Sequence, residues 1–271
     1  MKRTTMLTGL LALLVTTQTH AALVSEGELT IGSDLTYPPY NYLKNNAPAG
    51  FDVELMSLLA QQLSLAPRVK DTRFASLIMG LKSHKFDVVA STLYVTPERA
   101  QQVAFIPYMK TGGALLVKTN STDAPQRPED VCGKRVGSIK GGAWIPKLRA
   151  LSQSYCEPQQ RGAIDVKEFP TSPEVTQALF AGAIDVEYED AAVAKATVEK
   201  TGNRMKITST ALLYPVVVGL AVNKEDTALY DQLSTTLNKV SLTPQYSALL
   251  DKYNAQVPTA TDFQHALDGT L

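Results

Sequence analysis

Short apolar segments of two kinds alternate along most of the chain, and this alternation limits the possible folds more than any other feature. Compact apolar runs at 29–32 and 87–90 have the length of buried strands. After a turn-rich stretch at 37–50, leucines recur at helical spacing, as at Leu55 and Leu59. Strands that alternate with helices favour parallel sheets covered by helices. We therefore predict an α/β fold.

The alternation begins a second time after a polar loop that ends at Pro128. A weak internal repeat accompanies it, because the helix–turn–Asp–strand pattern over 77–88 recurs over 175–186. We infer two lobes built alike, the second inserted within the first. The predicted division is a first lobe of residues 22–114 and 219–257, a second lobe of residues 115–218, and a loose C-terminal tail of residues 258–271.

The N-terminus carries the pattern of a secretory signal. Lys2 and Arg3 precede an apolar stretch at 7–15, and Thr19-His20-Ala21 is typical of a small-residue cleavage site. A stretch of this length is too short to cross about 30 Å of hydrocarbon as a helix. We therefore predict a cleaved signal peptide at residues 1–21 and an exported, soluble mature chain.

Charge and cysteine content argue against several classes of function. The chain has 26 basic and 26 acidic side chains without a basic cluster, which argues against a nucleic-acid partner. Its two cysteines, Cys132 and Cys156, most simply form one disulfide in an exported protein. A metal-binding thiol pair is the alternative, but beyond the signal peptide only His84 and His265 remain to complete it. We expect neither a metal site nor a cofactor.

Unusual polar or glycine residues directly follow four of the predicted strands. In open α/β sheets, ligands bind beyond the carboxyl ends of the strands. Two of these positions belong to each lobe, so we predict that all of them converge on one cleft. The alternative is that Asp, Ser and Gly only form loops here. The positions are Ser33-Asp34 with Tyr37, Ser91-Thr92, Gly141-Gly142, and Glu189-Asp190.

Several of these residues, with Arg99 at the start of a predicted helix, are suited to a carboxylate. A guanidinium offers a planar fork of hydrogen-bond donors. The hydroxyls of Ser91 and Thr92 would add donors, as would the backbone N–H groups of Gly142-Ala143, where a helix is expected to begin. Arg99 could instead form a surface ion pair, for example with Glu98.

The remaining members of the set are suited to a positive charge and an apolar stem. Asp34 and Asp190 are acceptors that could hold an ammonium group, and Tyr37 and Phe74 could enclose the stem. One cation, two carboxylates and aromatic walls are together complementary to a small zwitterion.

Four segments carry a resemblance to a known family. They are Leu29-Thr-Ile-Gly-Ser-Asp-Leu-Thr-Tyr-Pro-Pro-Tyr40, Gly50-Phe-Asp-Val-Glu-Leu55, Ser91 with Thr96-Pro-Glu-Arg99, and Cys132-Gly-Lys-Arg-Val-Gly137. Over residues 28–253 the chain resembles the periplasmic solute-binding proteins of polar amino acid ABC transporters (bacterial extracellular solute-binding protein family 3). The resemblance implies a type II periplasmic binding protein fold, whose two lobes close on a ligand about two crossing strands, here expected near 113–117 and 216–219.

The resemblance also implies a partner and residue roles. A soluble periplasmic monomer would bind a small amino acid or derivative and deliver it to an inner-membrane ABC permease. Arg99 would hold the α-carboxylate and Asp190 the α-ammonium, while Ser91 and Thr92 would add hydrogen bonds. The side-chain pocket would be lined by Asp34, Tyr37 and Phe74.

Two departures from the family pattern bear on the ligand. Relatives usually carry Ser or Thr where this chain has Tyr94, which either supplies a longer-reaching hydroxyl or fills space. They also carry a Gly-Thr-Thr-like turn where this chain has Gly141-Gly142-Ala143, so the hydroxyls of that turn are missing and only backbone donors remain. These changes favour a larger or modified amino acid over an ordinary one.

Glu187 and Glu189 form a third unusual feature, since such strands usually carry apolar or neutral residues at these positions. Close to Asp190, the two carboxylates would favour a cationic ligand such as arginine, lysine, ornithine or an opine. The alternative is that strand alternation turns both side chains away, toward a solvated or salt-bridged edge.

Two other classes of function compete with binding alone. An enzyme on the same scaffold, a dehydratase of the cyclohexadienyl or arogenate type, needs an acid or base placed against its substrate. No histidine lies in the predicted cleft, so Glu187 or Glu189 would have to serve. The sensory domain of a receptor would need a transmembrane helix after the two lobes, which is not expected before Leu271. We predict binding without catalysis.

Overall fold

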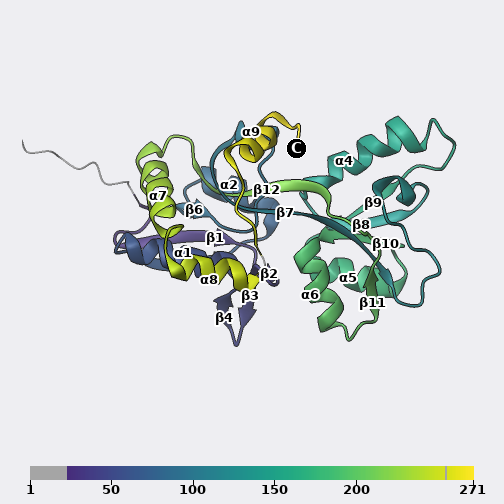
Figure 1. Cartoon of the computed structure of the whole chain (residues 1–271), viewed down its shortest axis with the longest axis horizontal. Helices are drawn as coiled ribbons and strands as arrows, with labels where there is room; N and C mark the ends of the chain where they lie inside the picture. The colour runs from purple at the N-terminus through teal and green to yellow at the C-terminus, as the bar shows by residue number, and fades with distance from the viewer. Residues whose placement is uncertain (1–22, 254) are drawn as a thin grey trace, which may run out of the picture.

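The computed structural model describes residues 23–253 and 255–271, and in it the chain forms two lobes that lie side by side along the long axis (Figure 1). The predicted signal peptide lies outside the described residues. Within them, no helix combines the length and the apolar character needed to span a bilayer. The predicted α/β class is confirmed.

Lobe 1 is a mixed sheet, in the order β5-β1-β6-β12-β7, with helices on both faces. On one face α1, α7 and α8 pack in the main core, and on the other α2 and α9 form a second apolar cluster. The strands are β1 (Glu28–Ser33), β5 (Ala66–Asp71), β6 (Val88–Val89), β7 (Val103–Lys118) and β12 (Leu213–Asn223). The helices are α1 (Phe51–Gln62), η1 (Phe74–Ser76), α2 (Leu77–Lys82), α3 (Pro97–Ala100), α7 (Thr227–Val240), α8 (Pro244–Tyr253) and α9 (Ala260–Asp268).

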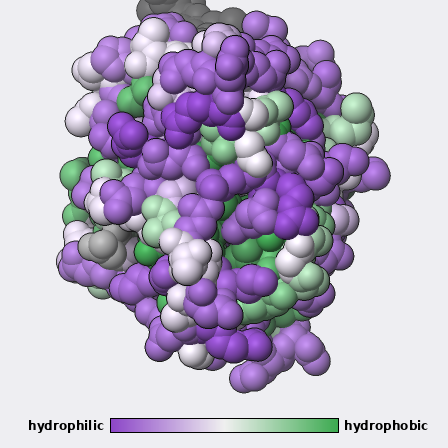
Figure 2. Space-filling model, turned by 90° about the vertical axis from the view of Figure 1, so that its right-hand side faces the viewer, coloured by the Kyte–Doolittle hydropathy of each residue, from purple (hydrophilic) through white to green (hydrophobic). Residues whose placement is uncertain are grey.

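Lobe 2 continues the same sheet beyond β7 in the order β10-β8-β9, with β11 paired to β7. Both β9 and β10 pair with β8 in parallel, as the strand–helix alternation predicts. Hydrophilic side chains cover most of the end of the molecule that faces the viewer in Figure 2. The strands are β8 (Arg135–Ile139), β9 (Asp165–Phe169), β10 (Val186–Asp190) and β11 (Met205–Ile207). The helices are η2 (Pro128–Val131), α4 (Trp144–Leu151), η3 (Ser152–Cys156), α5 (Ser172–Ala181) and α6 (Ala191–Lys200).

Strands β7 and β12 run from one lobe into the other and are the only antiparallel pair that spans both in the described part of the chain (Figure 1). Residues 103–111 of β7 pair with β12, and from Gly113 onward the same strand pairs with β10 of lobe 2. The pairing of β7 with β12 shifts register between Leu213 and Val216, beside this change of partner. The predicted lobe boundaries fall within these two strands, where a small bend would move one lobe against the other.

The C-terminal segment differs from the predicted loose tail, because it forms α9. Thr259 caps this helix, and Ala266 is buried against lobe 1. Lys110 of β7 holds the segment at two points: its backbone N–H donates to the carbonyl of Gln256, and its Nζ lies 2.8 Å from Oδ1 of Asp262. The turn-rich stretch at 37–50 also contains a small sheet of β2 (Thr36–Tyr37), β3 (Asn41–Lys44) and β4 (Ala47–Ala49), which the sequence pattern did not reveal.

The predicted disulfide between Cys132 and Cys156 is confirmed. It joins the end of η2 to the end of η3, and Cys156 is fully buried. Replacing both cysteines by alanine is expected to lower the free energy of unfolding by about 3–4 kcal/mol, because closing a loop of this length restricts the unfolded chain. Urea denaturation of the double variant and of the oxidised parent measures the difference. Equal midpoints in the two proteins would contradict this role.

Candidate functional site

Side chains from both lobes meet in a narrow cleft between the strand ends. They enclose a cavity of about 10 Å³, which is room for about one water molecule. The lobes therefore almost touch here, and the cavity as it stands is too small for an amino acid. Apart from Ile139 and Trp144, every lining residue is among the predicted site residues. The lining consists of Tyr37, Phe74, Thr92, Tyr94, Ile139, Gly142, Ala143 and Trp144.

Arg99 projects from the short helix α3 to the edge of this cleft, where with Gly141 it lines two neighbouring hollows rather than the small cavity itself. Thr96 caps the helix by accepting a hydrogen bond from the backbone N–H of Arg99. The guanidinium is buried, lies 5.5 Å from the Phe74 ring centroid and donates to two backbone carbonyls, Tyr94 O at 2.7 Å and Gly141 O at 2.9 Å. Since Gly141 belongs to lobe 2, Arg99 joins the two lobes.

The charge of Arg99 has no counter-ion within the part of the chain that the structure describes. No carboxylate there lies within 4.0 Å of its guanidinium, so the alternative of a surface ion pair with Glu98 is wrong. Burial lowers the pKa of Arg99 to about 10, which still leaves the side chain positive at neutral pH. A buried cation held only by neutral carbonyls can accept an anion.

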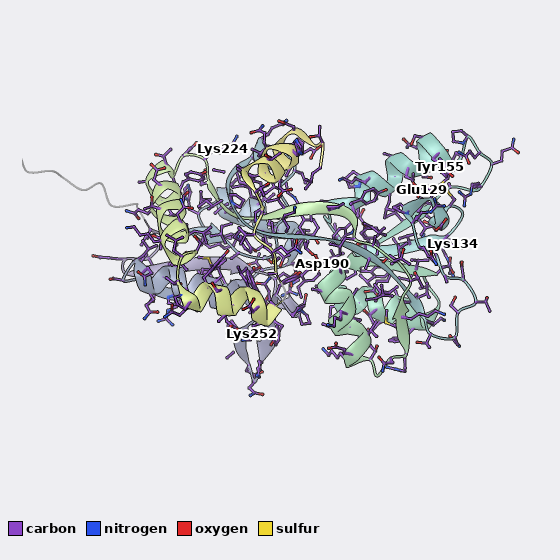
Figure 3. The ribbon with its side chains drawn as sticks, in the orientation of Figure 1. Glu129, Lys134, Tyr155, Asp190, Lys224 and Lys252 are labelled. Carbon is purple, nitrogen blue, oxygen red and sulfur yellow. A yellow bond between two sulfur atoms is a disulfide. The ribbon has the colours of Figure 1, made fainter. Side chains whose placement is uncertain are left out.

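Asp190 lies at the end of β10, between the two lobes (Figure 3). One carboxylate oxygen caps α6 by accepting from the backbone N–H of Ala192 at 2.9 Å. The other accepts from the hydroxyls of Tyr94 at 2.7 Å and Thr111 at 2.8 Å. Burial raises the pKa of Asp190, and the hydroxyl donors oppose that rise. Every partner of this carboxylate is neutral, as are the partners of Arg99.

Glu189 lies beside Asp190 at the boundary between the lobes, in contact with Tyr37, which lines the cavity. Its Oε1 accepts from the hydroxyl of Tyr37 at 2.5 Å and from the backbone N–H of Asp190 at 2.8 Å, and its Oε2 accepts from the hydroxyl of Ser172 at 2.6 Å. Tyr37 belongs to lobe 1, so this is a further contact between the lobes. Burial raises the pKa of Glu189 to about 7. The alternative of a solvated or salt-bridged edge is therefore wrong for this residue.

Glu187 lies on the same side of β10 but under α5. Thr176 donates to its Oε1 at 3.1 Å, while its Oε2 has no hydrogen-bond partner within residues 23–253 and 255–271. It is fully buried rather than solvated, because α5 covers this face of the strand. Burial, and then the charge of Glu189, raise the pKa of Glu187 well above its usual range.

Glu187 is expected to make the free energy of unfolding fall as pH rises. The folded chain keeps the proton above the ordinary pKa of 4.5, and the unfolded chain loses it, so rising pH favours unfolding. Glu187→Gln removes this pH-dependent contribution to the free energy of unfolding. Its stability relative to the parent should be higher at about pH 8 than at about pH 5, as measured by urea denaturation at both values. A difference that stays constant with pH would show that Glu187 titrates normally.

Two predicted site residues lie behind the cavity and hold the loop that carries Tyr37. Asp34 accepts from Thr36 and from the backbone N–H of Phe74, and it forms an ion pair with Arg73 at 3.0 Å. Ser91 accepts from the backbone N–H of Asp34 at 2.9 Å. Neither side chain lines the cavity, and their contacts are made within lobe 1, so the expectation that they face a ligand stays a prediction.

Thr92 and Gly142 line the cavity, but their expected donors are used within the chain. The hydroxyl and the backbone N–H of Thr92 both donate to Oδ2 of Asp52, at 3.2 and 2.7 Å. This contact holds Thr92 in an unusual positive-φ conformation, with φ of 47°. The N–H of Gly142 closes the turn by donating to Ile139 O at 3.1 Å.

Besides Ile139, three residues at the site were absent from the predicted set. Trp144 packs against Tyr94, with ring centroids 5.3 Å apart, and its indole N–H donates to Ser138. It is the single tryptophan and directly follows the glycine turn, a signal that could have identified it. Thr111 and Ser172 gave no such signal, because their roles depend on strand crossing and on the packing of α5 over β10.

Two α/β lobes joined by two continuous strands, with polar side chains from both lobes facing one cleft, define the type II class of periplasmic binding proteins. The sequence profile of the bacterial extracellular solute-binding proteins, family 3, matches residues 29–256. The chain belongs to this family.

Individual relatives agree with this assignment. The ABC transporter arginine-binding protein 1 of Escherichia coli K12 is 27% identical over 252 residues, which cover 91% of this chain and 98% of that protein. The holo form of ArgBP from T. maritima is similar in structure, with a TM-score of 0.73 and 30% identity over 84% of this chain and 96% of that one. An ancestral amino acid-binding protein, a precursor of cyclohexadienyl dehydratase, has a TM-score of 0.71 and 26% identity over 84% and 95% of the chains.

Proposed function

We propose that the chain binds a small zwitterion in the cleft, with the α-carboxylate on Arg99 and the α-ammonium on Asp190. One observation carries the proposal: a buried cation and a buried carboxylate contribute to the same cleft, and only neutral groups contact either of them. Buried charges are unfavourable unless they are paired. A ligand with one charge of each sign supplies both partners through charge-assisted hydrogen bonds.

The contacts between the lobes suggest how the ligand is enclosed. Arg99 reaches Gly141 O, Tyr94 reaches Asp190, and Tyr37 reaches Glu189, each from lobe 1 to lobe 2. Bending of β7 and β12 breaks these contacts together and opens the cleft. A ligand that replaces them with charged partners then favours reclosure, since it binds the closed form better than the open one.

The relatives support the rest of the proposal. They include a protein named as the arginine-binding protein of an ABC transporter, which supports an amino acid or a derivative as ligand and an ABC permease as partner. The chain would act in the periplasm as a monomer after removal of residues 1–21, and would pass its ligand to the permease of the inner membrane.

A thermal-shift screen of the mature chain against amino acids, opines, polyamines and organic acids tests the proposal. Protein denatured and refolded without ligand is used, so that no bound solute is carried over. At 100 times its dissociation constant, a ligand adds about 2.7 kcal/mol of stability. For a chain of this size the expected rise in Tm is about 5–10 °C. No shift from any α-amino acid or opine, with a clear shift from a polyamine or simple acid, would refute the zwitterion site.

An enzyme of the dehydratase type remains a second candidate because of Glu189. A carboxylic acid buried in the cleft with a pKa of about 7 has the properties of a general acid at neutral pH. The similarity to the ancestral precursor of cyclohexadienyl dehydratase also supports this candidate. Incubation with prephenate and arogenate separates the two functions: binding alone predicts no turnover, and turnover lost in Glu189→Gln would establish the enzyme.

A further inference from the structure

The charges that face the cleft do not sum to zero. Arg99 contributes one positive charge, and Asp190 and Glu189 contribute one negative charge each when ionised. The buried carboxylate of Asp34 is paired with Arg73, which it shares with the exposed Asp71, so it is left out of this balance. A plain zwitterion would pair with Arg99 and Asp190 and would leave Glu189 buried without a counter-ion, which is unfavourable.

We propose that Glu189 binds a second positive charge on the ligand, so that the site selects dibasic α-amino acids or their derivatives. This inference rests on the proposed function and adds to it the chemistry of the ligand side chain. The ammonium or guanidinium group would replace the hydroxyl of Tyr37 at Oε1 of Glu189, while Ser172 continues to hold Oε2. With this ligand, every charge in the closed cleft has a partner.

Glu189 is better suited to this role than Asp34, the other acidic side chain near the cleft. A carboxylate has about four acceptor positions. Asp34 uses them for the backbone N–H and hydroxyl of Thr36, the backbone N–H of Phe74 and the guanidinium of Arg73. Glu189 accepts only three hydrogen bonds, and one of them comes from Tyr37, which moves with lobe 1 when the cleft opens.

The same contacts make the binding of a cationic ligand depend on the protonation of Glu189. The groups that contact Glu189 are the hydroxyl of Tyr37 from β2, that of Ser172 from α5 and the backbone N–H of Asp190 on β10. The acids Asp190 and Glu187 lie on the same strand and interact with its charge. None of them is a cation, and the pKa of Glu189 is raised to about 7, so the carboxyl is partly protonated at neutral pH. A cationic ligand must displace this proton, and its affinity is expected to fall as pH drops below about 7.

Titration calorimetry with L-arginine and L-citrulline tests the proposal, since the two differ mainly in the charge at the end of the side chain. The mature parent chain is expected to prefer arginine on the order of 100-fold, as for loss of one partner of a buried charge pair. Glu189→Gln should reduce this preference to within about threefold, chiefly by lowering the affinity for arginine. Glu187→Gln is the matched control, a neighbouring acid on the same strand that does not face the cleft, and it should keep the preference.

A second readout does not depend on any variant. Arginine binding to the parent at about pH 6.5, measured in two buffers with different ionisation enthalpies, should release a fraction of a proton, and citrulline should release none. Equal affinities for arginine and citrulline in the parent would overturn this inference and leave the zwitterion proposal standing. Binding of neither compound, together with no response from any α-amino acid in the thermal screen, would overturn both. An arginine preference that survives Glu189→Gln in a folded variant would assign the cation to another group.

Discussion

Replacing Arg99 by alanine is expected to weaken the binding of α-amino acid ligands on the order of 100- to 1,000-fold. The guanidinium is the one buried cation that contributes to the cleft among the described residues, and it already lies against both lobes. Its removal would leave the ligand carboxylate buried without a counter-ion, and this penalty, rather than the loss of two hydrogen bonds, sets the size of the effect. Titration calorimetry on the parent and the variant measures it.

Two controls make the Arg99 result interpretable. Circular dichroism and urea denaturation show whether Arg99→Ala still folds, since the side chain also bonds Tyr94 O and Gly141 O. Arg99→Lys keeps the positive charge but loses the planar fork, and it should recover part of the affinity. Unchanged affinity in a folded Arg99→Ala variant would show that the carboxylate binds elsewhere.

Asp190→Asn is expected to lower the affinity for the same ligands on the order of 100-fold. Asparagine caps a helix about as well as aspartate does, so the contact with the backbone of Ala192 at the start of α6 should survive. What is lost is the negative charge that pairs with the α-ammonium. Calorimetry again gives the affinity, and a thermal unfolding curve close to that of the parent confirms that the fold is kept.

Thr111→Val provides a comparison for the Asp190 variant. It removes one of the hydroxyl donors to Asp190 but keeps the carboxylate, so its effect on affinity should be much smaller than that of Asp190→Asn. If Asp190→Asn bound amino acids as tightly as the parent, the ammonium would have to lie against a different acceptor, and Glu189 would be the first to test.

Position along the strands made the location of Arg99 and Asp190 at the boundary between the lobes predictable. Each follows a recognisable strand or cap signal, and parallel strands bring their carboxyl ends to one edge of a sheet. The same reasoning placed Asp34 and Ser91 near the cleft, but it did not predict their partners. Local sequence places a residue near the cleft, but it does not show whether its side chain pairs with a neighbour, as Asp34 does with Arg73.

Glu189 illustrates a limit set by strand geometry. Alternation shows that Glu187 and Glu189 share one side of β10, but it does not show which side faces the other lobe or where α5 will lie. The answer depends on Tyr37, which is 152 residues away in sequence. The long-range packing that places Tyr37 opposite Glu189 is invisible in a local pattern.

Tyr94 shows that two alternatives left open by the sequence both apply. Its hydroxyl reaches across the cleft to Asp190, and its ring packs against Trp144, so it supplies a donor and also fills space. The C-terminal helix was missed for a different reason. Thr259 and Asp262 form a capping box that can be recognised in the sequence, but few apolar residues follow, and the segment gains order from its contacts with Lys110 and lobe 1.

The most direct test of the zwitterion site removes one charge at a time from the ligand. The α-amino acid or derivative with the largest thermal shift is compared by titration calorimetry with its decarboxylated amine and its deaminated acid, on the parent chain. We predict that each truncated ligand binds at least about 100-fold more weakly, and that Arg99→Ala no longer distinguishes the intact ligand from the amine. Equal binding of the intact ligand and the amine by the parent chain would contradict the account, because Arg99 would then have no carboxylate to bind.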